Sequence, residues 1–166
     1  MKNAIKIKSA TVSDIPLILS LIKELADYEK LSHEVVATEE ALKKTLFGQH
    51  PHAEIIIGYL NDIPVGFALF FHNYSTFLGR PGIYLEDLYV KKDVRGNGVG
   101  QKMLSYIARI AKEQECGRLE WSVLDWNEPA INFYKSVGAK PMNEWTVYRL
   151  TGDALDKFAA SGNDTQ

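Results

Sequence analysis

The sequence predicts a single α/β domain in which helices flank a mixed β-sheet. Runs with apolar residues at helical spacing alternate with short segments rich in β-branched and aromatic residues, which are typical of strands. Two of these segments, 53–60 and 63–74, are separated only by the turn signal Asn61-Asp62, so we expect an antiparallel hairpin rather than a purely parallel sheet. A length of 166 residues with no internal repeat or linker corresponds to one domain over residues 1–166.

The first half of the chain predicts a strand and two helices before the hairpin. Residues 4–8 alternate apolar and polar side chains, as a short strand does. A helix follows, with Ser13 or Asp14 as its cap and Pro16 in its first turn. A second, shorter helix begins after Thr38. The apolar face of the first helix consists of Ile15, Ile18, Leu21, Ile22, Leu25 and Tyr28.

The second half alternates strands and helices around a glycine-rich segment. We expect, in order, a loop at 72–82, a strand at 83–90, a glycine-rich turn at 95–100, a helix through 103–111, a strand at 119–124, a helix between Pro129 and Gly138, a final strand at 141–150, and a short helix from 152 with a polar tail from about 160. This order supports the mixed sheet.

Composition and charge exclude several function classes. With 46% apolar and 24% charged residues, the chain matches a soluble globular protein and neither a disordered nor a fibrous one. The net charge of −2 and the shortness of apolar runs such as 65–71 lead us to expect no nucleic-acid or membrane partner. The single cysteine, Cys116, excludes a disulfide framework, and the first residues lack the apolar core of a signal peptide, so we expect a cytoplasmic protein.

Charge is unevenly distributed along the chain. Residues 23–40 contain six acids and two lysines, a net charge of −4, whereas residues 91–102 contain four basic residues and one acid, a net charge of +3. The first segment would suit a cationic ligand and the second a phosphate, but on charge alone solvated surface is the favoured explanation of both.

The glycine-rich segment Val94–Gly100 lies between a predicted strand and a predicted helix. Glycines let backbone N–H groups approach an anion, and the helix N-terminus adds a positive partial charge, so this loop is a candidate phosphate site. Gln101 follows Gly100 where a Walker loop needs Lys, and the two-and-two spacing of Gly96, Gly98 and Gly100 does not match the dinucleotide fingerprint. A purely structural tight turn is the alternative.

The pattern Arg95-x-x-Gly98-x-Gly100 resembles the R/Q-x-x-G-x-G/A signature of the Gcn5-related N-acetyltransferases (GNAT), in which this loop holds the pyrophosphate of acetyl-CoA. YLEDLYV at 84–90, WNEPAINFY at 126–134 and LIKELADYE at 21–29 are similar to the diamine (spermidine/spermine) branch of that family. The resemblance covers residues 5–155. It implies a GNAT-like domain with a mixed, mostly antiparallel sheet, and acetyl-CoA as co-substrate.

Acetylation of an amine requires removal of a proton, because a free primary amine has a pKa of about 10. The resemblance implies that Glu86 removes it through a water molecule and that Tyr134 protonates the leaving sulfur. Taken alone, Glu86 is an acid in an apolar strand, where burial would raise its pKa, or else a carboxylate facing water. Taken alone, Tyr134 has the spacing of a core residue.

The resemblance also implies the acetyl-CoA contacts. Residues 88–90 would pair by backbone with the pantetheine arm like an added strand, and Asn127 would bond to that arm or only cap its helix. The expected cofactor-binding residues are Leu88, Tyr89, Val90, Arg95, Gly96, Asn97, Gly98, Val99, Gly100, Gln101, Asn127, Ala130 and Tyr134.

The amine is expected to be small and cationic. Asp87 points away from Glu86 in a regular strand, unless a β-bulge redirects it. The chain departs from the diamine branch at Glu120, where relatives often carry histidine, and at 145–148, so a lysine-like amino acid such as thialysine is an alternative to a polyamine. The expected substrate-binding residues are Tyr28, Glu29, Glu86, Asp87, Glu120, Trp121 and Ser122.

Other features of the chain predict no additional chemistry. Its histidines lack metal-ligand spacing, so we expect no metal, and Cys116 is expected to pack rather than react, which leaves direct transfer. The resemblance implies a homodimer that shares the C-terminal strand. The alternatives are a CoA-binding sensor without turnover, a GNAT enzyme acting on a protein, peptide or aminoglycoside, and a nucleotide-binding protein.

Overall fold

A five-stranded mixed sheet organises the first part of the chain, in the strand order β1-β2-β3-β4-β5. Strands β1 to β4 pair antiparallel, and β5 pairs parallel with β4, so the predicted mixed, mostly antiparallel sheet is confirmed. The strands are β1 (Ile5–Ser9), β2 (Glu54–Leu60), β3 (Ile63–Ser75), β4 (Arg80–Val90) and β5 (Leu119–Trp121).

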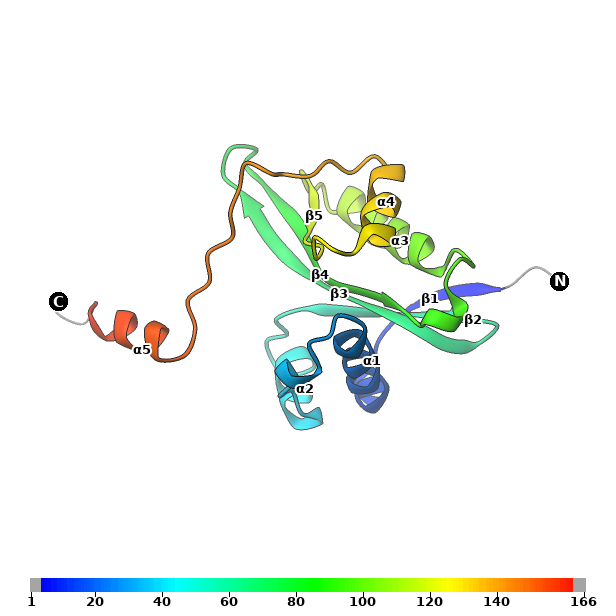
Figure 1. Ribbon diagram of the computed structural model, residues 1–166, viewed down its shortest axis with the longest axis horizontal. Coiled ribbons are helices and arrows are strands. Elements are labelled where there is room, and N and C mark those ends of the chain that lie inside the picture. The colour runs from blue at the N-terminus through cyan, green and yellow to red at the C-terminus, as the bar shows by residue number, and fades with distance from the viewer. Residues whose placement is uncertain (1–3, 163–166) are drawn as a thin grey trace. The chain divides into compact units, whose positions relative to one another are not determined.

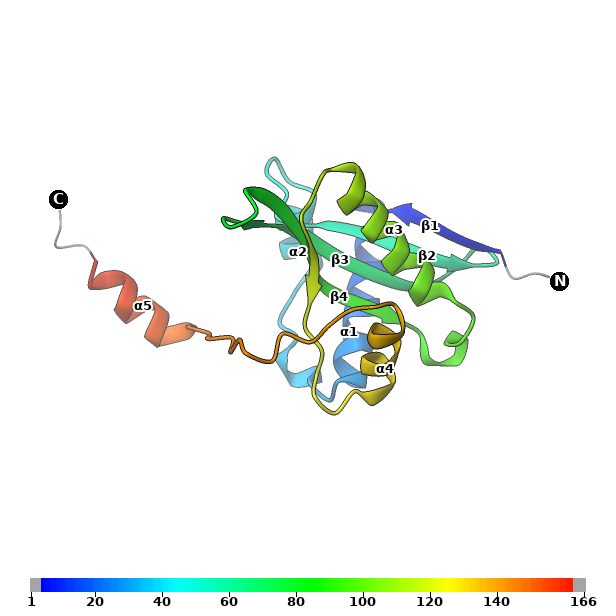
Figure 2. The same ribbon diagram turned by 90° about the horizontal axis from the view of Figure 1, so that it is seen from above.

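The computed structural model describes residues 4–162, and the chain divides into two compact units, residues 1–122 and 123–166. In the first unit, α1 (Ile15–Tyr28) and α2 (Glu39–Leu46) cover one face of the sheet and α3 (Val99–Glu113) covers the other (Figures 1 and 2). Within the described part of the chain, no helix is long and apolar enough to cross a membrane.

Helices pack on both faces of the sheet, and they are the helices that the spacing of apolar residues predicts. Ile18 and Leu21 of α1 are fully buried in a cluster with Phe67 of β3 and Tyr89 of β4. On the opposite face, Met103 of α3 lies against β2, where a Cβ on Gly58 would come within 2.7 Å of the Met103 sulfur. Burial of such side chains stabilises each helix by roughly 1.5–3 kcal/mol per residue.

The helix starts follow the predicted cap chemistry with one change. The Thr38 hydroxyl accepts a hydrogen bond from the Ala41 N–H at 3.1 Å and begins α2 as expected. Asp14 directly precedes α1 but does not cap it with its side chain. Its carboxylate instead accepts a hydrogen bond from the Thr11 N–H at 2.8 Å, which forms a capping box at the preceding 3-10 turn, Val12–Asp14.

The expected loop at 72–82 is wrong, because β3 and β4 continue through most of it. Asn73 lies opposite Gly82, and a Cβ on Gly82 would come within 2.4 Å of the Asn73 side-chain oxygen. Glycine here therefore permits strand pairing instead of ending it. The strand expected at 119–124 is shorter, because β5 ends at Trp121.

The second unit contains α4 (Glu128–Ser136) and α5 (Gly152–Ala160). Gly138, with φ of 88°, ends α4: its N–H bonds to the Lys135 carbonyl and the Ala139 N–H bonds to the Tyr134 carbonyl, which is a Schellman motif. The start near Pro129 and the end at Gly138 are as predicted.

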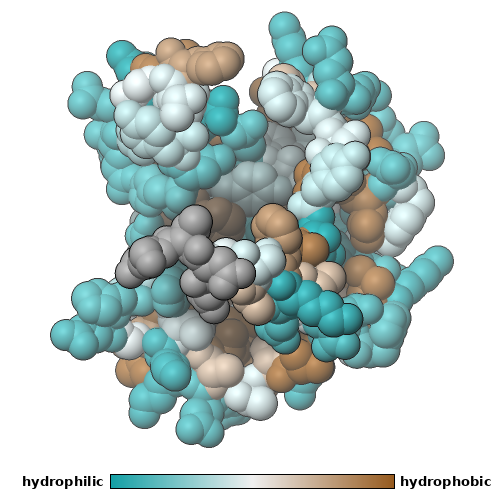
Figure 3. All heavy atoms as spheres, turned by 90° about the vertical axis from the view of Figure 1, so that its left-hand side faces the viewer, coloured by the Kyte–Doolittle hydropathy of each residue, from teal (hydrophilic) through white to brown (hydrophobic). Residues whose placement is uncertain are grey.

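The strand expected at 141–150 is wrong, since this segment forms no strand in the structure. A strand needs a partner for its backbone N–H and C=O groups, and the apolar pattern of the segment supplies none by itself. Its side chains are instead exposed, with Trp145 at 77%, Val147 at 82% and Tyr148 at 93%. Figure 3 shows apolar side chains (brown) at the surface among hydrophilic ones. The end of the predicted polar tail, 163–166, lies outside the described residues.

Candidate active site

A β-bulge in β4 places the two acidic residues of that strand. Phe70 of β3 pairs with Leu85, and the next pair is Leu69 with Asp87, so Glu86 is an extra residue without an opposite partner. The Glu86 side chain is exposed, which contradicts the expectation of a buried carboxylate and agrees with the alternative that it faces water.

The bulge decides which face of the sheet carries Asp87. Residues directly opposite each other in paired strands share a face, and Leu69 packs against the cluster formed by α1 and α2. Asp87 therefore lies on the α1 face, whereas Leu85 lies on the α3 face with Phe70. In a regular strand, Leu85 and Asp87 would share one face.

The charges of two carboxylates, Glu86 and Glu29, act on a third carboxyl, that of Asp87. Burial, together with the negative charges of Glu86 and Glu29, raises the pKa of Asp87 from 3.8 to about 7. Burial also raises the pKa of Glu29, which caps the C-terminal end of α1. A perturbed carboxyl beside other carboxylates is the arrangement expected where a cation or a proton is bound.

Beyond the bulge, the backbone of β4 is no longer paired with β5. β5 pairs with β4 only at Ile83–Leu85, while β3 pairs with β4 as far as Val90. Among the described residues, no strand pairs with 87–90 on the β5 side. These N–H and C=O groups can therefore receive an extended ligand, as predicted for 88–90.

The glycine loop has the geometry of an anion site. Gly96 and Gly98 both have φ of 83°, a conformation that glycine adopts without steric cost. Gly98 is the N-cap of α3 and carries no side chain to cover the first-turn N–H groups, which belong to Val99, Gly100 and Gln101. The Asn97 side chain donates to the Val94 carbonyl at 2.8 Å and braces the loop.

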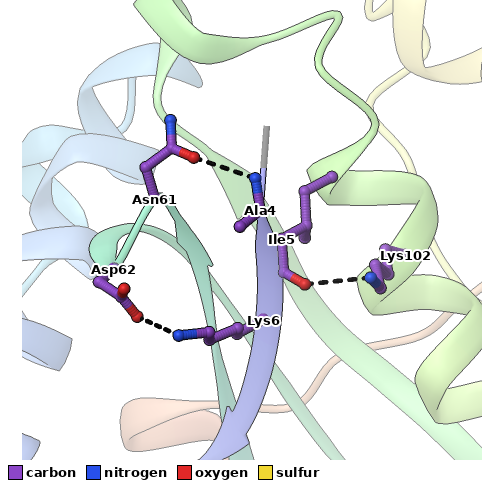
Figure 4. A network of polar contacts seen from close by, with 6 residues as sticks. All are labelled: Ala4, Ile5, Lys6, Asn61, Asp62 and Lys102. Carbon is purple, nitrogen blue, oxygen red and sulfur yellow. Dashed lines mark hydrogen bonds and ion pairs between the residues drawn. The ribbon is translucent and has the colours of Figure 1, made fainter. Parts of the chain in front are cut away.

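The basic side chains of 91–102 are held by other parts of the first unit. The Lys91 ammonium lies 3.3 Å from the Glu24 carboxylate, and Lys102 donates to the Ile5 carbonyl at 3.0 Å. Figure 4 shows Lys102 directed to β1, with the Lys6–Asp62 ion pair on the other side of that strand. Lys91 and Lys102 are therefore engaged within the first unit, and the backbone N–H groups at the start of α3 are candidate donors to a phosphate.

Tyr28, expected at the amine, contacts the cationic residues of the loop. The Arg95 guanidinium carbon lies 4.2 Å from the centre of its ring, and the Lys92 ammonium lies 5.7 Å from it. Glu24, one turn earlier in α1, binds Lys91 and accepts from the Tyr89 hydroxyl at 3.3 Å. Glu24, Lys91 and Lys92 were missed, although the i, i+4 spacing of Glu24 and Tyr28 places both on one helix face.

The expected substrate residues of β5 divide between the two faces. Glu120 lies opposite Tyr84 and Trp121 opposite Leu85, so these neighbours point to different sides of the sheet. Glu120 is ion-paired with Arg118 at 2.7 Å and accepts from the Asn73 amide at 3.3 Å. The Ser122 hydroxyl bonds to the Tyr84 hydroxyl at 2.7 Å. Glu120 and Ser122 are thus already engaged within the first unit.

The remaining predicted residues lie in the second unit. The Asn127 side chain accepts from the Ala130 N–H at 3.4 Å and caps α4, as expected for either of its proposed roles. Tyr134 lies on α4, its ring centre 5.5 Å from that of Phe133. Among the described residues, no group of three or more His, Cys, Asp and Glu side chains is placed to hold a metal ion.

Residues 20–139 match the sequence model of the acetyltransferase (GNAT) family. The chain belongs to this family. The resemblance that the glycine signature indicated is therefore confirmed, and this GNAT chain is an acetyltransferase enzyme.

Three curated relatives are similar to this GNAT chain over most of its length. Thialysine N-epsilon-acetyltransferase of Bos taurus is 39% identical and covers 93% of this chain and 97% of its own. L-ornithine N5-acetyltransferase of Arabidopsis thaliana is 35% identical, covering 90% of this chain and 86% of its own. A spermidine/spermine N(1)-acetyltransferase-like protein of Homo sapiens is 33% identical over 90% of this chain but only 23% of its own.

A solved structure has the same fold. An integron cassette protein of V. cholerae superposes on this GNAT chain with a TM-score of 0.79 and 28% identity, covering 96% of this chain and 98% of its own. The predicted GNAT-like architecture is thus confirmed.

Proposed function

We propose that the protein transfers the acetyl group of acetyl-CoA to a primary amine of a small cationic substrate. The observation that carries this proposal is the group of carboxylates at the bulge of β4, where Asp87 lies next to Glu86 and within the electrostatic influence of Glu29, the residue that follows α1. Their charge attracts an ammonium group, and a carboxylate is the base that the reaction requires. Residues 87–90, which no described strand pairs on the β5 side, begin at the same position.

Acetyl-CoA fits the residues present in the first unit. The first-turn N–H groups of α3 and the left-handed Gly96 and Gly98 suit a pyrophosphate, and the free edge of 88–90 suits the pantetheine arm. When bound, acetyl-CoA supplies the activated acetyl group. Asn127 and Ala130, at the start of α4, are further residues that we propose for acetyl-CoA binding.

Glu86 is the general base in this proposal, and it acts through water. Its exposed position at the bulge leaves room for a water molecule between the carboxylate and the amine. Asp87 and Glu29 hold the ammonium group before the proton leaves, because their charge stabilises a cation. Tyr134 is the general acid that protonates the departing sulfur, since a tyrosine hydroxyl can donate a proton and accept it back.

The substrate class that we favour is an amino acid with a side-chain amine, such as thialysine or ornithine. The relatives that this chain covers most completely carry those names, whereas the spermidine/spermine relative is matched over a minor part of its length. Glu120 also supports this choice, because its charge is balanced by Arg118, which leaves fewer carboxylates for a long polycation.

The deciding experiment measures CoA release with thialysine, lysine, ornithine, putrescine, spermidine and spermine. Nε-acetyl-lysine is the matched control, because it retains the amino acid and lacks the side-chain amine. We expect turnover with thialysine or ornithine and none with the control. Binding of acetyl-CoA without turnover on any amine would instead favour a non-catalytic sensor.

The proposed assembly is a homodimer, with both units forming one acetyltransferase domain in each chain. The family match at 20–139 extends over parts of both units. The exposed Trp145, Val147 and Tyr148 supply an apolar surface that a second copy can bury. The cytoplasm is the proposed location, because the lone Cys116 suits a reducing compartment.

A further inference from the structure

The side chain of Tyr28 is directed to the glycine loop. Its ring lies under the Arg95 guanidinium at 4.2 Å and under the Lys92 ammonium at 5.7 Å. Both distances are within the range in which the negative face of an aromatic ring attracts a cation. A planar guanidinium at the shorter distance can also stack on the ring.

The Arg95 side chain is also held by a hydrogen bond to the backbone. Its Nε donates a hydrogen bond to the Val90 carbonyl at 2.9 Å. Val90 ends β4, and Arg95 directly precedes Gly96, the first left-handed residue of the loop. The Arg95 side chain therefore ties the entry of the glycine loop both to the last residue of β4 and to the last residue of α1, Tyr28.

The preceding turn of α1 strengthens this connection. Glu24 binds the Lys91 ammonium at 3.3 Å and accepts from the Tyr89 hydroxyl at 3.3 Å. Two successive turns of α1 thus hold the end of β4 and the start of the loop through side-chain contacts. Glu29, the next residue after Tyr28, acts on Asp87 at the other end of the site.

We infer that Tyr28 is a positioning residue for acetyl-CoA, which holds Arg95 and through it the glycine loop in the conformation that receives the pyrophosphate. This inference rests on the proposed function, because it takes the loop as the acetyl-CoA site. It assigns two neighbouring residues at the end of α1 to different ligands, since Tyr28 serves the co-substrate and Glu29 serves the amine.

The experiment measures acetyl-CoA binding to the full chain by calorimetry without any amine, and then the KM of the amine. The variants are Tyr28→Leu, Tyr28→Phe and Glu29→Gln. Tyr106→Leu is the matched control. On α3, outside the site, the Arg109 guanidinium carbon lies 5.0 Å from the centre of the Tyr106 ring, so this substitution removes a cation–ring contact of the same kind.

Tyr28→Leu is expected to weaken acetyl-CoA binding about three- to tenfold, because it removes the ring face under two cations. Tyr28→Phe keeps that face and should restore wild-type binding, as should the control. Glu29→Gln should raise the KM of the amine and leave acetyl-CoA binding unchanged. Unchanged acetyl-CoA binding in Tyr28→Leu with a raised amine KM would overturn the inference and leave the proposed function standing.

A double-variant cycle tests whether Tyr28 acts through Arg95. Arg95→Met alone should weaken acetyl-CoA binding, and adding Tyr28→Leu to it should have no further effect. If the losses of acetyl-CoA binding in the two single variants add up in the double variant, the inference is overturned. This holds even if Tyr28→Leu is partly unfolded, because a general loss of stability would also add to the effect of Arg95→Met. A wild-type chain that binds no acetyl-CoA would overturn the proposed function together with this inference.

Discussion

Asp87 lies directly opposite Leu69 in the β3–β4 ladder and therefore shares the face of the sheet that α1 covers. The extra residue Glu86 causes this, because without it Asp87 would follow Leu85 onto the α3 face. One inserted residue thus gives the strand two adjacent carboxylates with different surroundings: Glu86 is exposed and Asp87 is partly buried.

The stability of the fold should depend on pH through Asp87. In the unfolded chain this carboxyl ionises near 3.8, whereas burial and the charges of Glu86 and Glu29 raise its pKa in the folded state to about 7. The folded state therefore binds the extra proton between these values, and the free energy of unfolding falls as the pH rises through that window.

Asp87→Asn should remove this dependence, so that the variant gains stability relative to wild type above pH 7 by roughly a few kcal/mol at most. Urea unfolding across the window measures the effect. Asp27→Asn is the control, because Asp27 is an exposed acid of α1. Equal pH slopes in wild type and Asp87→Asn would show that Asp87 ionises normally.

Glu86→Gln should lower the rate of amine acetylation at saturating substrates by about a hundredfold or more, as loss of a general base does. Tyr134→Phe should lower the rate through loss of the proton donor. Steady-state CoA release measures both, with Glu113→Gln on α3 as the control. Wild-type rates in both variants would refute the assigned roles.

Gly96→Ala should weaken acetyl-CoA binding more than it weakens the fold. An added Cβ at Gly96 meets no atom within 4 Å, so the cost arises from φ of 83° and amounts to about 1–2 kcal/mol. Gly79→Ala in the β3–β4 turn is the matched control, with φ of 62° and equal space. Both variants should lose similar stability in denaturant, but only Gly96→Ala should raise the acetyl-CoA Kd in calorimetry.

The apolar segment 141–150 should control assembly. Sedimentation velocity is expected to give wild type a mass of two chains of 18.7 kDa each. Replacing Trp145, Val147 and Tyr148 together by serine should yield single chains, because those side chains supply the apolar area for a second copy. Asn143→Ser is the control within the same segment. A monomeric wild type would contradict the proposed dimer.

Much of the fold could be predicted from local patterns. The apolar spacing of α1 and α3, the cap at Thr38, the Asn61-Asp62 turn and the Schellman end of α4 were all found where they were expected. The glycine signature at Arg95–Gly100 similarly indicated the family. These signals depend on residues within a few positions of one another, which the sequence displays directly.

Pairing between distant segments could not be predicted in the same way. Residues 141–150 have a strand-like composition but pair with no described strand. Most of the expected loop at 72–82 forms strands instead, because Gly82 has no side chain to collide with Asn73 on the paired strand. The register that makes Glu86 a bulge depends on β3, which a pattern within β4 does not reveal.

The sequence by itself therefore determined the family, the order of most elements and the position of the phosphate loop. Only the tertiary structure decided that Asp87 faces α1 with Glu29, and that Tyr28 contacts Arg95. The reason is physical: helix spacing and glycine conformation are set by neighbours along the chain. Burial, pKa and ring contacts instead depend on residues that folding brings together.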